Sequence, residues 1–184
     1  MKDIKQYIQE GFKLGKNKVS KITYNYFPKN KMELKEILKE RLAKDKDADL
    51  NDIDVSKIKN MMYLFDDLDP HNIDISEWDV SNVKDMHAMF ANCENLNCDL
   101  SNWDVSNVED MYCMFIYCSK FDCDLSGWDV SNVTDMYNMF YQCKSFKGKG
   151  LETWDVSNVI DMKWMLGGCD SLKNKPSWYK EYNE

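Results

Sequence analysis

The sequence lacks the features that mark membrane, secreted and zinc-binding proteins. No apolar run approaches the roughly 18 residues that a membrane span needs, and residues 1–20 contain no apolar signal core or cleavage site. The seven cysteines include no Cys-x-x-Cys pair, and the two histidines, His71 and His87, are isolated in the sequence. We therefore expect a cytoplasmic protein, in a host cell or a virion, with reduced thiols, no lipid anchor, no cofactor and no metal.

Signatures of catalysis are also missing from the sequence. No phosphate-binding loop or zinc motif is present, and the polar residues recur at a fixed spacing instead of forming one distinctive set. The cysteines have no basic residue suitably placed to activate them, which favours a role in packing. We expect a non-enzymatic protein.

Positive charge is scarce beyond the N-terminal quarter of the chain. Residues 1–52 carry 13 basic and 9 acidic side chains, whereas residues 53–184 carry 11 basic and 23 acidic ones. Such an acidic region repels phosphate groups. Direct nucleic-acid binding is therefore not expected, and a basic or polar protein is the better partner.

One motif is repeated through most of the chain. The stretch WDVSNVEDMYCMF at 103–115 has near copies at 78–90 and 128–140. The steps between successive Asp-Val-Ser sequences are 25, 25, 25 and 26 residues, and the extra residue falls within 147–154, beside two glycines. The sequence therefore contains five copies of one structural unit, and the insertion is expected in a connection between elements. The copies begin at Ile53, Trp78, Trp103, Trp128 and Trp154.

The spacing of apolar residues within each copy predicts a strand, a turn and a helix. Counting from the tryptophan, apolar residues occupy positions six, nine, twelve, thirteen and sixteen, as on one face of a helix. Ser106 and Asn107 are good N-caps for a helix that begins near Asn107. Segments 95–101 and 120–126 alternate apolar and polar residues, which is the period of a half-buried strand.

A unit of this size cannot bury its own core, so neighbouring copies are expected to stack. We predict an α/β repeat fold: a right-handed, leucine-rich-repeat-like solenoid of five strand-turn-helix units over residues 53–172. Residues 23–52 form its N-terminal helical cap, because Leu34, Ile37, Leu38 and Leu42 lie on one helical face within 31–43. Residues 173–184 form a C-terminal cap or tail, in which Trp178 and Tyr179 fold over the last exposed core residues.

The repeated unit W-D-V-S-N-V-x-D-M-x-x-M-F-x-x-C resembles the BspA-like leucine-rich-repeat family, in the version found in mycoplasma surface lipoproteins. The resemblance covers residues 53–172, and the segment FPKNKMELKEILKERL is similar to the capping helix that precedes such arrays. It implies a right-handed leucine-rich-repeat solenoid and a role in adhesion or protein binding. Intracellular versions in mobile elements and bacteriophages fit a chain without a signal peptide or anchor better than surface adhesion does.

Function is expected where the copies differ, because packing fixes the shared positions. Positions ten, eleven and fourteen vary most, and positions ten and fourteen are one helical turn apart. They predict an aromatic binding patch, although the same rings could instead cover the seams between adjacent units. The patch comprises His87, Tyr112, Ile116, Tyr137, Tyr141 and Trp164.

A second candidate binding surface is the acidic side of the predicted strands. Asp74, Asp99 and Asp124 recur at position twenty-two, and Asp122 lies at position twenty. Stacked carboxylates repel one another, so they need a basic partner, a cation or hydrogen bonds. Calcium is conceivable, but no dedicated calcium-loop spacing is present, and bonding to the backbone is the simpler expectation.

The N-terminal segment, residues 1–22, stands outside the repeat. Ile4, Tyr7, Ile8, Phe12 and Leu14 predict an imperfect amphipathic helix that carries six lysines, either as a further cap layer or as a docking peptide. The leading hypothesis for the whole chain is a protein-binding repeat module encoded by a phage, a mobile element or a bacterium. The alternatives are an acidic decoy that inhibits a nucleic-acid-binding host defence protein, and a structural component of a particle or surface assembly.

Overall fold

The computed structural model describes residues 10–15 and 18–180. In this part of the chain the regular elements are β1 (Glu10–Gly15), β2 (Lys18–Thr23), α2 (Lys31–Leu42) and the short 3-10 helix η1 (Leu151–Thr153). Strands β1 and β2 pair antiparallel as a hairpin, with Glu10 opposite Thr23 and Gly15 opposite Lys18. The repeats therefore fold almost entirely without helices or strands.

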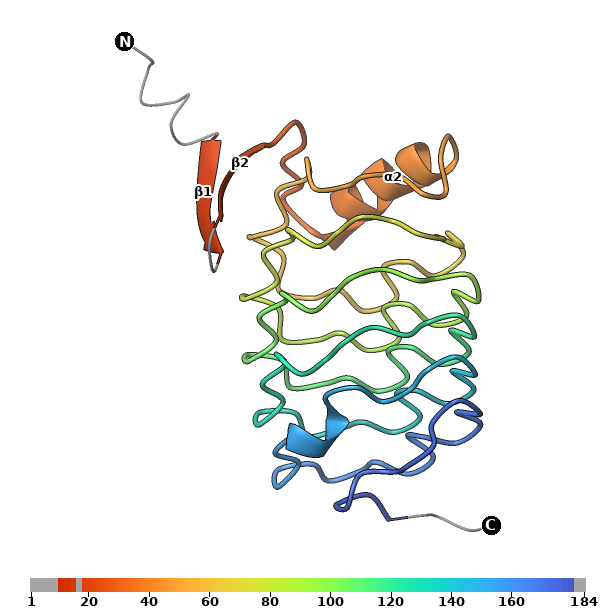
Figure 1. Cartoon of the computed structure of the whole chain (residues 1–184). Helices are drawn as coiled ribbons and strands as arrows, with labels where there is room; N and C mark the ends of the chain where they lie inside the picture. The colour runs from red at the N-terminus through yellow and green to blue at the C-terminus, as the bar shows by residue number, and fades with distance from the viewer. Residues whose placement is uncertain (1–9, 16–17, 181–184) are drawn as a thin grey trace.

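The repeats form a stack of coils, each coil being one copy of about 25 residues. Coils 1 to 5 comprise residues 53–77, 78–102, 103–127, 128–153 and 154–177. Backbone hydrogen bonds join equal or adjacent positions of neighbouring coils, and the isolated bridges between coils are all parallel. Helix α2 lies across the first coil, and the chain ends at the opposite end of the stack (Figure 1).

The predicted helices are absent because two positions in each coil have left-handed backbone. In every coil the residues at positions eleven and fifteen have φ between 48° and 70°, a conformation that no right-handed helix contains. Local hydrogen bonds close β-turns, in which an N–H group donates to the carbonyl three residues earlier, as from Leu64 to Met61 at 3.1 Å. The apolar steps of three are therefore those of consecutive β-turns. The left-handed residues are Tyr63, Asp67, Ala88, Asn92, Cys113, Tyr117, Asn138, Gln142, Trp164 and Gly168.

The predicted strands are also absent from the repeats. Burial does alternate along 120–126, since Phe121, Cys123 and Leu125 are buried between partly exposed neighbours. Bonds between coils are too sparse here for a strand: within 120–126, backbone N–H groups reach the neighbouring coils only from Lys120 and Leu125. The prediction of a leucine-rich-repeat-like solenoid of strand-turn-helix units is therefore wrong.

The residues predicted to cap a helix serve the turns and the stacking instead. Asp104 Oδ1 accepts hydrogen bonds from the backbone N–H and the hydroxyl of Ser106, at 3.1 and 2.6 Å. Asn107 Nδ2 donates to the carbonyl of Ser81 in the preceding coil at 2.8 Å. Asn82, Asn132 and Asn158 make the equivalent bond. The asparagine column thus ties each coil to the one before it.

The core consists of columns of identical or similar side chains along the stack. Phenylalanines at position thirteen stack with centroid distances of 4.8, 5.4 and 5.5 Å between successive coils. Each repeat tryptophan donates from its indole to a carbonyl 28 or 29 residues earlier, as from Trp103 to Ile75 at 3.0 Å. Cysteine thiols at position sixteen likewise donate to the phenylalanine carbonyl of the preceding coil, as from Cys118 to Phe90 at 3.0 Å. The polar groups of the column residues are thereby satisfied inside the core.

Helix α2 covers the first coil, as the sequence predicted. Asn30 caps its first turn by accepting from Glu33 N–H at 3.0 Å, and Leu34, Leu38 and Leu42 are buried. The amphipathic helix predicted for residues 1–22 is wrong where it overlaps β1 and β2, because residues 10–15 and 18–22 are extended. Its remaining residues, including Ile4, Tyr7 and Ile8, lie outside the described residues.

The last tryptophan continues the core column past the final coil. Trp178 donates from its indole to the carbonyl of Leu151 at 2.9 Å, in the same way as the repeat tryptophans. Trp178 and Tyr179 are partly buried against the core, as predicted. The extra residue of coil 4 lies in the connection around Gly150 and η1, where the sequence predicted it.

Candidate binding surface

Three of the predicted patch residues form a continuous aromatic ladder. His87, Tyr112 and Tyr137 occupy position ten of successive coils, and their rings stack with centroid distances of 4.6 and 5.2 Å. Tyr63 extends the ladder into coil 1, because its hydroxyl lies 2.9 Å from His87 Nε2. The ladder consists of Tyr63, His87, Tyr112 and Tyr137.

The ladder rests on a small hydrophobic cluster that is separate from the main core. Ala88 and Cys113, at position eleven, are buried beneath the rings, and Ala91 is buried at position fourteen. Tyr112, Tyr137 and the predicted site residue Ile116 pack against this cluster and stay partly exposed. Left-handed backbone at position eleven turns the chain directly after His87, Tyr112 and Tyr137. The rings therefore stand on a rigid turn framework, with small side chains below them.

The other predicted patch residues lie apart from the ladder. Tyr141 contacts Tyr117, with ring centroids 5.8 Å apart and nearly perpendicular planes. Tyr141 also covers Gly167, where an added Cβ would lie 2.8 Å from the ring. Trp164 is partly exposed at position eleven of coil 5 and contacts none of the ladder rings in the described chain. The structure thus joins only part of the predicted patch, and it adds Tyr63.

A column of acidic side chains runs beside the ladder, and the sequence analysis did not identify it as a binding site. Asp85, Asp110 and Asp135 occupy position eight, two residues before the ladder rings, and Asp161 continues the column in coil 5. Parallel bridges join these four aspartates from coil to coil. We call them the carboxylate ladder. The recurrence of Asp at position eight was visible in the sequence, but only the stacked turns bring these side chains beside the rings at position ten.

Each carboxylate of this ladder uses one oxygen to hold the backbone of a following residue. Asp110 Oδ1 accepts from Tyr112 N–H at 2.8 Å, and Asp135 Oδ1 accepts from Tyr137 N–H at 2.9 Å. The other oxygen of Asp110 lies 3.9 Å from His87 Nδ1. The side chain of Asp110 is 40% exposed, so it remains accessible to a partner.

The pKa of Asp110 is raised above its ordinary value of 3.8. Partial burial is the largest cause, the charges of Asp85 and Asp135 add to it, and His87 and the bond from Tyr112 N–H oppose it. Like charges in one column disfavour the ionised form. A cation placed beside the carboxylate ladder would relieve this electrostatic cost.

The predicted acidic surface has its own intramolecular partners. Asp74 and Asp99 accept from the backbone N–H of the serine two residues later, at 3.1 and 2.9 Å. Asp124 also pairs with Lys149 at 2.6 Å, and Lys147 pairs with Asp122. The bonds to Lys149 and Ser126 lower the pKa of Asp124 to about 2. Asp99, Asp122 and Asp124 line a shallow hollow, but lysines of the next coil already neutralise two of them.

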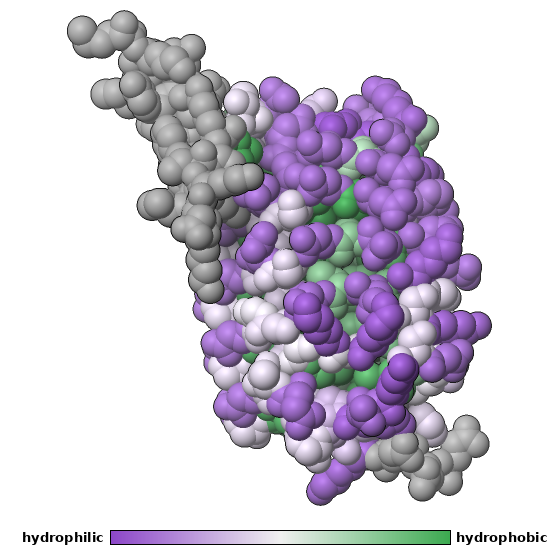
Figure 2. Space-filling model, in the orientation of Figure 1, coloured by the Kyte–Doolittle hydropathy of each residue, from purple (hydrophilic) through white to green (hydrophobic). Residues whose placement is uncertain are grey.

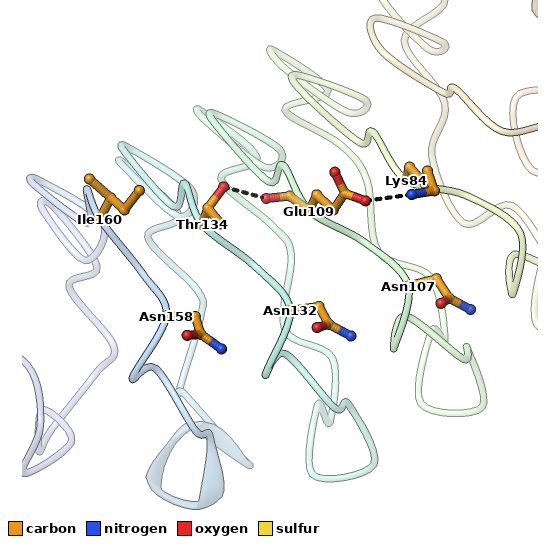
Figure 3. A pocket seen from close by; sticks show the side chains of 7 residues that line it. All are labelled: Lys84, Asn107, Glu109, Asn132, Thr134, Asn158 and Ile160. Atoms are coloured by element: carbon orange, nitrogen blue, oxygen red, sulfur yellow. Dashed lines mark hydrogen bonds and ion pairs between the residues drawn. The ribbon is translucent and has the colours of Figure 1, made fainter.

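A second shallow groove follows the asparagine column (Figure 3). Lys84 and Glu109 form an ion pair at 2.6 Å along its edge, and the Thr134 hydroxyl donates to the carbonyl of Glu109 at 3.0 Å. The groove has a volume of about 670 Å³. Its polar side chains are largely used to join coils, so it offers fewer free groups than the ladder surface. Its lining residues are Lys84, Asn107, Glu109, Asn132, Thr134, Asn158 and Ile160.

The thiols are held in their neutral form. Burial raises the pKa of Cys113 to about 11 and that of Cys93 to about 12, so neither is a thiolate at neutral pH. Among the described residues no three His, Cys, Asp or Glu side chains are grouped so as to hold a metal ion.

Figure 2 shows hydrophobic side chains in a narrow column along the stack, between hydrophilic ones. In the part of the chain that the structure describes, no helix is long and apolar enough to cross a membrane.

Comparison with known proteins identifies one family. The family model described as "Mycoplasma protein of unknown function, DUF285" matches residues 32–150 and 120–182. The match includes helix α2 and all five coils. No curated protein and no solved structure matches the chain.

Proposed function

The chain belongs to this Mycoplasma repeat family of unknown function, and we propose from its surface that it is a non-enzymatic module that binds a basic polypeptide. The finer resemblance of its repeat to BspA-like proteins supports a protein partner, and this assignment is part of the proposal. The observation that carries it is the aromatic ladder standing beside the carboxylate ladder.

The two ladders together suit arginine side chains. A guanidinium group stacks on an aromatic face and pairs with a carboxylate, and both kinds of group recur here in successive coils. The ladder rings are partly exposed, and their backbone is fixed by the carboxylate ladder itself. An extended segment with several arginines would therefore meet a preorganised surface, which reduces the entropy lost on binding.

The acidic character of position eight is not required by the fold. Coil 1 has Asn60 there, and its Oδ1 accepts from Met62 N–H at 3.0 Å as the aspartates do. Its Nδ2 also donates to Asp85 Oδ2 at 2.7 Å, which relieves repulsion along the column. Coils 2 to 5 keep an aspartate in spite of the partial burial and the repulsion that raise the pKa of Asp110. This favours a role for the charge in binding.

Peptide binding measured by fluorescence anisotropy tests the proposal. The probe is a labelled peptide of alternating arginine and glycine, and the matched control peptide has glutamine in place of arginine. We expect the arginine peptide to bind more tightly, with an affinity that falls as salt is added. The double variant Tyr112→Ala with Tyr137→Ala should weaken binding on the order of 30-fold, since each ring contributes about 1 kcal/mol.

The control variant is Tyr117→Ala, which removes an exposed ring outside the ladder. It should leave the affinity for the arginine peptide within about twofold of the parent value. Charge removal by Asp110→Asn with Asp135→Asn should also weaken binding while preserving the backbone bonds of the turns. Equal affinity for both peptides, or unchanged binding in both double variants, would refute the proposal.

The acidic decoy remains a second candidate, favoured by the excess of 12 negative charges in residues 53–184, which carry 11 basic and 23 acidic side chains. In that case the basic partner is a nucleic-acid-binding protein. Competition between this chain and DNA for a captured partner would support the decoy, whereas simultaneous binding of chain and DNA would exclude it.

A further inference from the structure

In one segment of each coil, from position nine to position fifteen, the N–H groups that bond between coils all donate in the same direction. At positions nine, eleven and thirteen the backbone N–H groups donate toward the following coil, as from Met136, Asn138 and Phe140 to coil 5. The carbonyls at positions eight, ten and twelve accept from the preceding coil. Along this segment, one end of the stack therefore presents carbonyl groups and the other presents N–H groups, whereas position seven donates the opposite way, as from Ile160 to Thr134.

The carbonyl end is covered by cationic side chains. Lys31 Nζ donates to the carbonyl of Met62 at 3.0 Å, and Lys35 Nζ donates to that of Tyr63 at 2.9 Å. Lys46 donates to the carbonyl of Leu68. Helix α2 covers the apolar residues beside them. At this end, positively charged side chains therefore bind the outward carbonyl oxygens, and apolar residues cover the core beside them.

The N–H end has no such cover in the described chain. The backbone N–H groups of Met162, Trp164 and Leu166, together with that of Gly168, have no acceptor among the described residues. Their counterparts in coil 4 all donate to coil 5, at 2.7 to 3.0 Å. Four donors at alternate residues therefore face outward on one edge.

Apolar side chains are partly uncovered beside these donors. Val156, Val159 and Met162 are partly exposed, whereas the residues at the same positions in coil 4, Val130, Val133 and Met136, are almost fully buried. Trp178 and Tyr179 cover only part of the end.

This end of the sequence is less acidic than the other repeats. Residues 161–184 contain four lysines and four acidic residues, whereas residues 53–160 contain 7 basic and 19 acidic ones. Aligned N–H groups carry positive partial charge and bind anionic groups. The four outward N–H groups therefore favour an anionic ligand, and the neutral local charge does not oppose one.

We propose that the open end of coil 5 binds an acidic segment of a partner protein, whose carboxylates accept hydrogen bonds from these four N–H groups. Apolar residues of the segment cover Val156, Val159 and Met162. A second copy of this chain is a poor occupant, because its own open end would place N–H groups against N–H groups and its other end is covered by α2.

Amide hydrogen exchange measured by NMR on the full chain tests the proposal. In the free protein, the amides of Met162, Trp164, Leu166 and Gly168 should exchange at least 10-fold faster than those of Met136, Asn138, Phe140 and Gln142. The probe is a peptide of alternating glutamate and leucine, and the control peptide has glutamine in place of glutamate. The glutamate peptide should slow the exchange of the four amides at least 10-fold.

A pair of variants distinguishes binding at the open end of coil 5 from general repulsion between the acidic peptide and an added negative charge. Met162→Glu places a carboxylate at the open end and should weaken binding of the glutamate peptide at least 10-fold. Ile160→Glu adds the same charge at a residue that is 88% exposed on the side of coil 5, and should weaken it less than threefold. Thermal unfolding checks that both variants stay folded.

Slow exchange of the four amides in the free protein would overturn the proposal. So would equal protection by the glutamine peptide, or protection confined to other coils. The assay is independent of the arginine-peptide assay above, so each proposal can fail alone.

Discussion

At the scale of single residues, position eight illustrates how one side chain serves both the turn and the surface. The aspartate there holds the backbone two residues later, and asparagine does the same in coil 1. Only the aspartate adds charge to the column. The effect of this charge on stability and its effect on binding can therefore be measured separately, by replacing the aspartate with asparagine.

We predict that Asp110→Asn stabilises the protein. The amide keeps an acceptor for Tyr112 N–H and can donate to Asp135, as Asn60 donates to Asp85. The gain should be about 0.5 kcal/mol, or 1 to 2 °C in Tm, because solvent at this 40% exposed side chain screens the repulsion. Thermal unfolding at pH 7 measures it.

The pH dependence gives an independent check of this prediction. Because the folded-state pKa of Asp110 is raised above 3.8, the folded protein binds this proton more tightly than the unfolded chain. Its ionisation therefore reduces stability as the pH rises from below 3.8 through the raised pKa, and the loss persists at neutral pH. The difference between variant and parent should grow over that window; a difference independent of pH would contradict the electrostatic cause.

At the scale of elements, the turns replace the helix that the apolar spacing predicted. Each coil has two residues with positive φ four positions apart, such as Cys113 and Tyr117, and they end the turns before a helix can propagate. Such backbone is unfavourable for side chains other than glycine and asparagine. The N–H groups that a helix would use internally bond to the neighbouring coil, so stacking compensates for the strain.

We predict that Gly150→Ala is strongly destabilising. Gly150 has φ of 97°, and an added Cβ would lie 2.2 Å from the backbone nitrogen of Ser126. Left-handed strain and this backbone clash together should lower the free energy of unfolding by more than about 2 kcal/mol. Chemical denaturation measures the change. Gly127→Ala is the control: its Cβ would approach the Ser101 carbonyl oxygen at 3.0 Å, and a loss as large as at Gly150 would contradict this explanation.

At the scale of the whole molecule, the two ends of the stack are chemically different, and among the described residues lysines close only one of them. We predict that the double variant Lys31→Met with Lys35→Met lowers the free energy of unfolding by about 1 to 2 kcal/mol. It leaves the carbonyls of Met62 and Tyr63 without their charged donors. Lys39→Met removes only a surface pair with Glu36 and should change stability by less than about 0.5 kcal/mol. Equal effects would exclude a capping role.

The candidate binding surface also depends on the whole stack. His87, Tyr112 and Tyr137 were predicted together from their shared position, and the structure brings their rings into contact. Tyr63 was missed because it lies one position later in its coil, where only the stacked geometry directs it toward His87. Tyr141 was expected in the same patch one helical turn away, and without a helix it contacts Tyr117 instead.

The sequence by itself determined the period, the residues that recur in the core and the helix that covers the first coil. Identical side chains at a fixed spacing can be buried only by placing the copies side by side, so the tryptophan and phenylalanine columns follow from periodicity. The tertiary structure decided the path of the backbone within each copy. A step of three between apolar residues fits both a helix and a series of turns, and only the bonds between coils select the turns. From position nine to position fifteen those bonds all run one way, which leaves a row of N–H groups without acceptors at coil 5 in the described chain.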